Sequence, residues 1–190
     1  MFITFDGVDG AGKTSLITAL AESLEDMGHD VHVFHFPMSD DVGEGLTGEK
    51  KAKDFVADMG LGYRHVILPL LEEEDDKRIV LVDRYKWTTY AYNIHGIIQD
   101  RLELDSWIRR LSFLLPDPDL SFYLTVDHDT AFFRKGEIEL EDYTRVTEGY
   151  EKIHELGYID HIIDGESTIK HNVGIVNTII ENAMRKATNE

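Results

Sequence analysis

The first fourteen residues carry the pattern that most limits the fold of this chain. Gly7, Gly12, Lys13 and Thr14 match G-x-x-x-x-G-K-[S/T], with an apolar strand pattern before it and a helical pattern after it. Glycines let the backbone wrap an anion with its N–H groups inward, and the N-terminus of the next helix adds partial positive charge. In such a loop the lysine reaches the β- and γ-phosphates, and the hydroxyl holds Mg²⁺. The pattern predicts an ATP-binding loop made of Gly7, Val8, Asp9, Gly10, Ala11, Gly12, Lys13, Thr14 and Ser15.

Short apolar runs alternate with helical patterns along the rest of the chain. After the first strand we expect strands at 31–36, 79–83, 120–126 and 158–163, and helices at 15–27, 50–58, 62–75, 86–98, 102–115, 127–134, 139–156 and 167–186. Such alternation predicts an α/β fold of the P-loop NTPase type, a three-layer sandwich whose five-stranded parallel sheet has helices on both faces. No linker or repeat divides the chain, so residues 1–190 are expected to form a single domain.

Charge and cysteine content narrow the range of partners. The net charge is −18, and polyanions such as DNA bind to basic surfaces, so we expect no nucleic-acid partner. The chain has no cysteine, no basic and apolar leader, and no apolar run long enough for a bilayer. These features predict a cytoplasmic protein without a membrane partner. A free nucleotide remains compatible with the acidity, because a few focused cations and a metal ion suffice to bind it.

A second polar motif follows the apolar run 79–82. Asp83, Arg84 and Tyr85 come where a buried parallel strand should end, at the same sheet edge as the glycine-rich loop. An acid in this place orients Mg²⁺ in P-loop enzymes, so Asp83 and Thr14 are the expected metal-site residues. Arg84 could clamp a phosphate through two parallel hydrogen bonds, and the alternative is a surface arginine paired with a neighbour.

Together these motifs identify a family resemblance that covers most of the chain. The residues that carry it are 5–14, Phe36-Pro37, Arg64, 83–85, Ala91-Tyr92, 116–120, Arg145 and Tyr150. The sequence resembles the thymidylate kinases, which belong to the P-loop nucleoside-monophosphate kinases. The resemblance implies Mg²⁺-dependent transfer of a phosphoryl group from ATP to dTMP, giving dTDP, by a protein that forms a homodimer.

The resemblance also implies roles for single residues. Asp9 would contact the acceptor's 3′-hydroxyl and phosphate region, and Arg84 would hold the acceptor phosphate. Phe36 and Pro37 would form a wall of the base pocket, Thr89 would face the base, Arg64 would point at the pyrimidine O4, and Tyr92 would lie under the sugar. Gly10 occupies a loop position that is arginine in some relatives, so a lid at about 134–141 must supply this group. Arg134 is the candidate, and the expected catalytic residues are Lys13, Arg84, Arg134 and Asp9. The loop at 164–167 is the expected adenine contact.

The chain departs from the family pattern at the base pocket. The aromatic ring that usually stacks on thymine is expected near Gly60, where there is none, which leaves Met59, Leu61 or Phe36 to take its place. The alternative is therefore a kinase of another deoxynucleoside monophosphate, including a modified one, or of a deoxynucleoside. A regulatory P-loop switch is a remote third, because no Asn-Lys-x-Asp guanine motif is present.

Overall fold

The computed structural model describes residues 1–73, 77–98, 100–136 and 139–187. Five parallel strands form one sheet in the order β2-β3-β1-β4-β5. Their bounds are β1 Phe2–Gly7, β2 Asp30–His35, β3 Arg78–Asp83, β4 Leu120–Thr125 and β5 His161–Asp164. The three central strands are almost wholly buried and mostly apolar, because helices cover both faces of the sheet. The expected three-layer α/β fold is confirmed.

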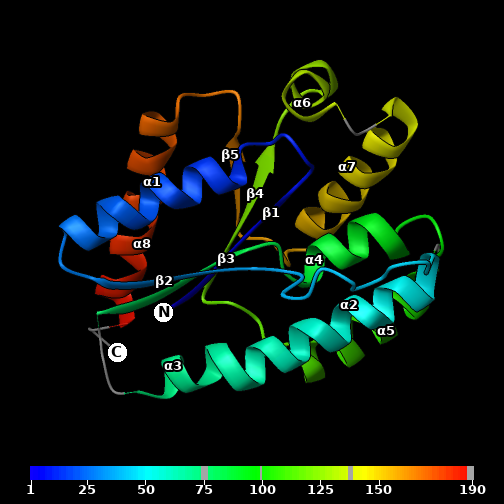
Figure 1. The fold of residues 1–190 in the computed structure, drawn as a ribbon, viewed down its shortest axis with the longest axis horizontal. Helices are drawn as coiled ribbons and strands as arrows, with labels where there is room; N and C mark the ends of the chain where they lie inside the picture. The colour runs from blue at the N-terminus through cyan, green and yellow to red at the C-terminus, as the bar shows by residue number, and fades with distance from the viewer. Residues whose placement is uncertain (74–76, 99, 137–138, 188–190) are drawn as a thin grey trace.

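Helices flank the sheet on two sides, as Figure 1 shows. α1 Lys13–Asp26 and α8 Ile169–Ala187 pack together on one side. The other side carries α2 Gly48–Gly62, π-helical η1 Tyr63–Ile67, α3 Leu68–Glu72, α4 Lys86–Thr89, π-helical η2 Tyr90–Ile94, α5 Arg101–Leu114 and α7 Leu140–Glu155. α6 His128–Lys135 lies near the carboxyl ends of the strands. Among the described helices, none has both the length and the apolar character needed to cross a bilayer.

The region after β2 differs from the sequence prediction. We expected two helices, at 50–58 and 62–75, but the helical run is continuous from Gly48 to Glu72, through the π-helical turn η1. The helix continues through Gly62. A Cβ at this position would lie 2.7 Å from Phe36 Cε1 and from Met38 Sδ, so the glycine allows the helix to pack closely on the segment after β2. Residues 74–76 of the predicted helix lie outside the described residues.

Smaller differences concern element ends. The helix expected at 86–98 ends at Ile94, and β5 begins at His161 rather than at 158. Residues 137 and 138, inside the expected lid at 134–141, are outside the described part of the chain. The second, third and fourth strands were predicted to within one residue at each end, and the first strand precedes the glycine-rich loop as expected.

Candidate active site

The phosphate-binding loop joins the end of β1 to the start of α1. The φ angles of Gly7, Gly10 and Gly12 are 151°, 83° and 91°, in the region that glycine tolerates best. A Cβ at Gly10 would lie 2.7 Å from the carbonyl oxygen of Ala131, so α6 packs directly against the loop. Both the backbone angle and this close approach require glycine at position 10, so the position cannot supply an arginine.

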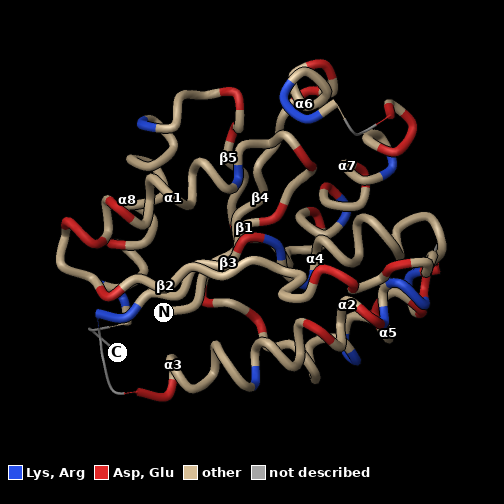
Figure 2. The backbone as a smooth tube through the Cα atoms, viewed as in Figure 1, with Lys and Arg blue, Asp and Glu red and all other residues tan. Residues whose placement is uncertain are grey.

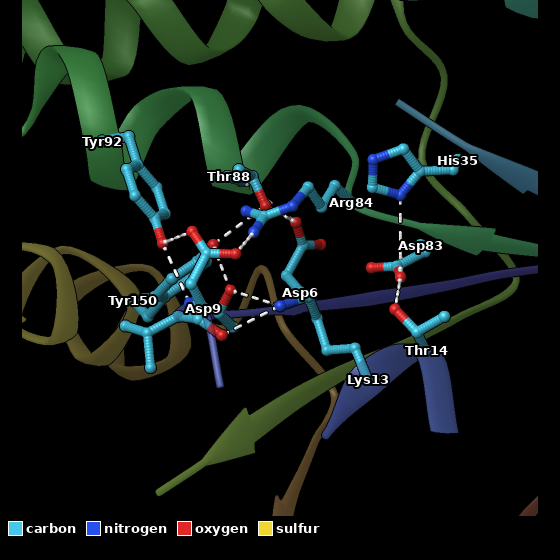
Figure 3. A network of polar contacts seen from close by, with 12 residues as sticks. Asp6, Asp9, Lys13, Thr14, His35, Asp83, Arg84, Thr88, Tyr92 and Tyr150 are labelled. Carbon is cyan, nitrogen blue, oxygen red and sulfur yellow. Dashed lines mark hydrogen bonds and ion pairs between the residues drawn. The ribbon is translucent and has the colours of Figure 1, made fainter. Parts of the chain in front are cut away.

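Lys13 is the first residue of α1, and only 5% of it is exposed. Its Nζ donates hydrogen bonds of 2.9 Å to the carbonyl oxygens of Gly7 and Val8 (Figure 3). Burial and the positive charge of Arg84 lower the pKa of Lys13 to about 8, although three nearby carboxylates oppose the shift. The ammonium group therefore lies within the loop, where it can turn toward a bound phosphate.

Asp83 and Thr14 form a pair of oxygen donors at the end of β3. Thr14 Oγ1 donates to Asp83 Oδ2 at 2.7 Å, and His35 Nδ1 lies 3.6 Å from the same oxygen. Burial alone would raise the pKa of Asp83, but the His35 contact, the charge of Lys13 and the Thr14 hydroxyl lower it. Asp83 Oδ1 is buried and has no hydrogen-bond partner among the described residues. An ionised carboxylate with a free oxygen beside a hydroxyl suits a hard cation such as Mg²⁺.

Arg84 has the left-handed φ of 70°, and no other described non-glycine residue has a positive φ. Its backbone N–H donates to the carbonyl oxygen of Phe5 at 2.9 Å. The turn directs the guanidinium toward the P-loop, where Nη2 forms an ion pair with Asp9 Oδ1 (Figure 3). The guanidinium carbon also lies 5.6 Å from the centre of the Tyr92 ring.

Asp9 and Tyr92 are joined directly. The Tyr92 hydroxyl donates to Asp9 Oδ2 at 3.1 Å and accepts from the Asp9 backbone N–H at 3.2 Å. Burial alone would raise the pKa of Asp9, but the charges of Arg84 and Lys13 and these hydrogen bonds lower it. Asp9 is therefore an anion, held between a guanidinium group and a phenol.

Asp6 supports this cluster from inside the protein. The residue is fully buried, and its Oδ1 accepts from Tyr85 N at 3.1 Å, Thr88 N at 3.0 Å and Thr88 Oγ1 at 2.6 Å. Burial raises the pKa of Asp6, and the bonds from Thr88 and Tyr85 offset part of that rise. Since Tyr85 follows Arg84 directly, Asp6 holds the residue next to the left-handed turn. Sequence analysis did not assign Asp6 a role.

Two cavities meet at this cluster. One, of about 600 Å³, lies over the P-loop and is lined by Gly12, Lys13, Thr14, Asp83 and their neighbours. The other, of about 430 Å³, extends beside α2 and η2. Asp9 and Arg84 line both cavities. A donor phosphate in the first cavity and an acceptor phosphate in the second would thus lie on either side of the same ion pair.

The second cavity contains most of the residues predicted to bind an acceptor. Phe36, Pro37, Thr89 and Tyr92 line it together with Asp9 and Arg84. Arg145 also lines it, and its guanidinium donates to the Tyr92 carbonyl oxygen and to Asp142 Oδ1, both at 3.0 Å. The lining combines aromatic and apolar side chains with charged ones, as a nucleoside monophosphate would need.

Arg64 is not part of this cavity, so the prediction that it contacts the base is wrong for this structure. The residue is exposed on η1 and lines a separate groove between α2 and α5. Its placement depends on the phase of the helical run. Five residues separate it from Met59, so in a regular α-helix it would lie about 140° around the axis from the cavity side.

Phe55 is an aromatic residue of the second cavity that sequence analysis missed. Phe55 lines the second cavity with Met59 and Lys51, and these three follow one another at intervals of four residues on α2. Asn93 lines the cavity as well, from η2. The four-residue spacing was visible in the sequence, but the assumed helix break near Gly60 hid the shared face.

Arg134 lies at the end of α6 and bridges two loops. Its Nη1 donates to the carbonyl oxygens of Gly10 at 2.9 Å and Gly165 at 3.1 Å. Arg134 and Lys135 both line the cavity over the P-loop. The side chain is thus on the donor side of the site, between the P-loop and the loop after β5.

A parallel sheet with this loop, an acidic residue at the neighbouring strand end and two adjoining cavities defines the class of P-loop nucleotide-binding proteins. The sequence model of the thymidylate kinase family matches residues 5–173. The chain therefore belongs to the thymidylate kinase family.

Individual relatives agree with the family match. A thymidylate kinase of Prosthecochloris aestuarii is 31% identical over 182 residues, covering 80% of each chain. One of Chlorobaculum tepidum is 30% identical and covers 80% of this chain and 83% of its own. The thymidylate kinase of Acholeplasma laidlawii is 29% identical, and the alignment covers 98% of this chain and all of the relative.

Proposed function

We propose that this chain phosphorylates dTMP to dTDP, with ATP as the phosphoryl donor. The observation that carries the proposal is the Asp9–Arg84 pair, which lines both the P-loop cavity and the acceptor cavity. Two nucleotides bound in these cavities would approach each other by their phosphates. In-line transfer needs this arrangement, because holding the reactants in place replaces most of the encounter entropy.

Cations of this chain stabilise the charge that moves during transfer. Lys13 faces the donor phosphates from the P-loop, and Arg84 faces the acceptor phosphate. Arg134 adds a third charge from the lid once its side chain leaves the Gly10 and Gly165 carbonyl oxygens. Such fixed charges act strongly in a site from which water is excluded, and exclusion also prevents hydrolysis of ATP. Residues 134–141 are proposed as this lid.

Acceptor recognition falls to side chains of the second cavity. Phe36 and Pro37 form one wall of the base site, with Phe55 as an additional ring, and Thr89 faces the base. Tyr92 lies under the sugar, where its ring excludes a 2′-hydroxyl, and Asp9 receives the 3′-hydroxyl. The ring of Phe55 also removes the reason for considering another acceptor, which was the missing aromatic side chain.

Thr14 and Asp83 would hold Mg²⁺, with the remaining ligands from phosphate oxygens and water. The free buried oxygen of Asp83 supports this assignment. The described residues contain no group of three or more carboxylates or histidines suited to a metal. Mg²⁺ sites at nucleotides typically use only one or two protein carboxylates, so the donor set fits. When bound, the ion would neutralise charge on the donor phosphates.

An acceptor panel tests the proposal. Turnover of dTMP, dUMP, dCMP, dGMP and dAMP is measured with ATP and Mg²⁺ in a coupled assay, and dTMP should be among the best acceptors. Lys13→Ala should lose nearly all turnover while keeping the fold, because it removes the charge facing the donor phosphates. Arg64→Ala is the matched control, and its turnover should equal that of wild type. Absence of turnover with every pyrimidine monophosphate would end the proposal.

We further infer a cytoplasmic homodimer without nucleic-acid partners. The groove of about 960 Å³ between α2 and α5 is mostly apolar and supports pairing of two copies on this face. Phe113 and Leu114 at its rim are 89% and 56% exposed. Acidic residues are spread over helices on both sides of the sheet (Figure 2), which disfavours a polyanion. Sedimentation at micromolar concentration should give twice the chain mass of 21.8 kDa, and a monomer would contradict the inference.

A further inference from the structure

Helix α2 presents two different sides to two different cavities. Lys51, Phe55 and Met59 line the acceptor cavity, whereas Lys53 and Arg64 belong to the groove on the other side of the helical run. Met59 is buried, and Phe55 is half-buried. The side of α2 that faces an acceptor therefore consists of two apolar side chains and one lysine.

The lysine lies beside the aromatic ring on the same side of α2. Lys51 Nζ lies 5.9 Å from the centre of the Phe55 ring. A Cβ added at Gly43 would lie 2.8 Å from Phe55 Cε2 and 3.0 Å from Lys51 Cγ, so the loop before α2 packs against both. This packing confines the aliphatic stem of Lys51 beside the ring. Because the ammonium group lies over this ring, a base that enters the cavity and stacks on Phe55 comes close to it.

The ammonium group of Lys51 is available to donate hydrogen bonds to a ligand. Within the described ranges, Lys51 Nζ makes no hydrogen bond and no ion pair. The two other cations of the cavity are engaged: Arg84 is paired with Asp9, and Arg145 donates to a backbone carbonyl oxygen and to Asp142. A lysine can donate three hydrogen bonds and accept none. It would therefore interact favourably with a carbonyl oxygen on a base and unfavourably with an exocyclic amino group.

We propose that Lys51 is a specificity-determining residue that selects acceptors whose base presents a carbonyl oxygen to it. Thymine and uracil have an oxygen at position 4, where cytosine, a base of nearly the same size, has an amino group. The proposal deepens the function proposed above and rests on it. Lys51, four residues before Phe55 on α2, would then distinguish pyrimidines with an oxygen at position 4 from those with an amino group there.

The test compares four proteins: wild type, Lys51→Met, Lys51→Arg and Lys53→Met. Methionine keeps the length of the stem and removes the charge, and arginine keeps the charge. Lys53 is the matched control, because it is 73% exposed on the opposite side of the same helix and pairs with Glu49 at 3.0 Å. For each protein, kcat/KM is measured with dTMP, dUMP and dCMP, and binding of the three nucleotides is measured by calorimetry.

Lys51→Met should lower kcat/KM for dTMP and dUMP by about 10- to 100-fold, the range for losing one hydrogen bond from a charged donor. The value for dCMP should stay the same or rise, so the ratio of dTMP to dCMP falls. Lys51→Arg should keep most of that ratio, and Lys53→Met should keep all of it. Equal losses for dTMP and dCMP would indicate a merely structural lysine and overturn the proposal, as would unchanged ratios.

Failure of the proposed kinase activity gives a separate result. If wild type turned over no acceptor, calorimetry would still compare dTMP and dCMP in wild type and Lys51→Met. Preference of wild type for dTMP that disappears in the variant would support the role of Lys51 without any turnover. Identical preference in both proteins, including none in either, would refute it.

Discussion

Replacing Asp6 tests how the Arg84 turn is held. Asp6→Leu keeps a side chain of similar size and removes the oxygen that accepts from Tyr85 N, Thr88 N and Thr88 Oγ1. The threonine hydroxyl retains Tyr150, 2.8 Å away, as a partner. The Thr88 backbone N–H also keeps an acceptor, the carbonyl oxygen of Tyr85 at 3.1 Å. The Tyr85 backbone N–H has no such replacement among the described residues, so it would be left buried and unpaired.

The expected cost follows from that one N–H group. Because a buried donor without a partner is unfavourable, Asp6→Leu should lower the free energy of unfolding by about 1–3 kcal/mol. A domain of this size has only about 5–15 kcal/mol in total. Asp6→Asn keeps one acceptor oxygen for the Tyr85 N–H and should cost less than about 1 kcal/mol. Urea unfolding at pH 7, followed by circular dichroism, measures both differences.

The pH dependence of the free energy of unfolding gives an independent test of Asp6, through the comparison of wild type with Asp6→Asn. Burial raises the pKa of Asp6 above its ordinary value of 3.8, so the folded state holds the proton more tightly than the unfolded chain. The stability from this protonation is complete below pH 3.8 and declines as the pH rises through the folded-state pKa. Asparagine does not titrate, so the free-energy difference between wild type and Asp6→Asn should shift in favour of asparagine as the pH rises from 3.8 through the folded-state pKa.

Two results would refute this reasoning. Equal destabilisation by leucine and asparagine at pH 7 would show that the acceptor oxygen does not matter. An unchanged free energy of unfolding in Asp6→Leu would show that the Arg84 turn does not depend on Asp6.

Three further predictions concern the loop, the lid and a helix contact. Because the pKa of Lys13 is about 8, ATP affinity measured by calorimetry without acceptor should fall up to about tenfold between pH 7 and pH 9; a flat profile would contradict a charged Lys13 in binding. Arg134→Ala should lower kcat more than it raises the acceptor KM in steady-state assays, and an effect on KM alone would count against a role in the transition state. Gly149→Ala should cost about 1–3 kcal/mol in urea unfolding, since its Cβ would lie 2.9 Å from Ala91 Cα, whereas Gly174→Ala, with open space around it, should cost nothing; equal effects would show that the contact adapts.

The sheet and the P-loop side of the site could be predicted from sequence because their signals are local. The glycine-rich loop needs its residues within eight positions, and Asp83 and Arg84 follow a buried strand directly. Parallel strands then bring both segments to one edge, whatever the connections contain. The structure accordingly brings Lys13, Thr14, Asp83 and Arg84 together as expected.

The base end of the acceptor cavity could not be predicted in the same way. Which side chains line it depends on how the helical run from Gly48 to Glu72 is rotated about its axis. The sequence prediction divided this run into two helices, with a break at 59–61. In the fold, Gly62 is needed because Phe36 and Met38 approach too closely for a side chain. An unbroken helix moves Arg64 away from the cavity and brings Phe55 into it. The low helix propensity of glycine predicted a break, but tertiary packing against Phe36 and Met38 is the reason for the glycine at position 62.

The ion pair between Asp9 and Arg84 has a consequence for the energetics of ligand capture. Without a nucleotide, the aspartate occupies the guanidinium and keeps this long side chain in one conformation, so its rotamer entropy is already lost. An incoming phosphate exchanges one anionic neighbour for another and gains less enthalpy than it would from an unpaired arginine. In return, it meets a guanidinium group that is already oriented, so less conformational entropy is lost on binding.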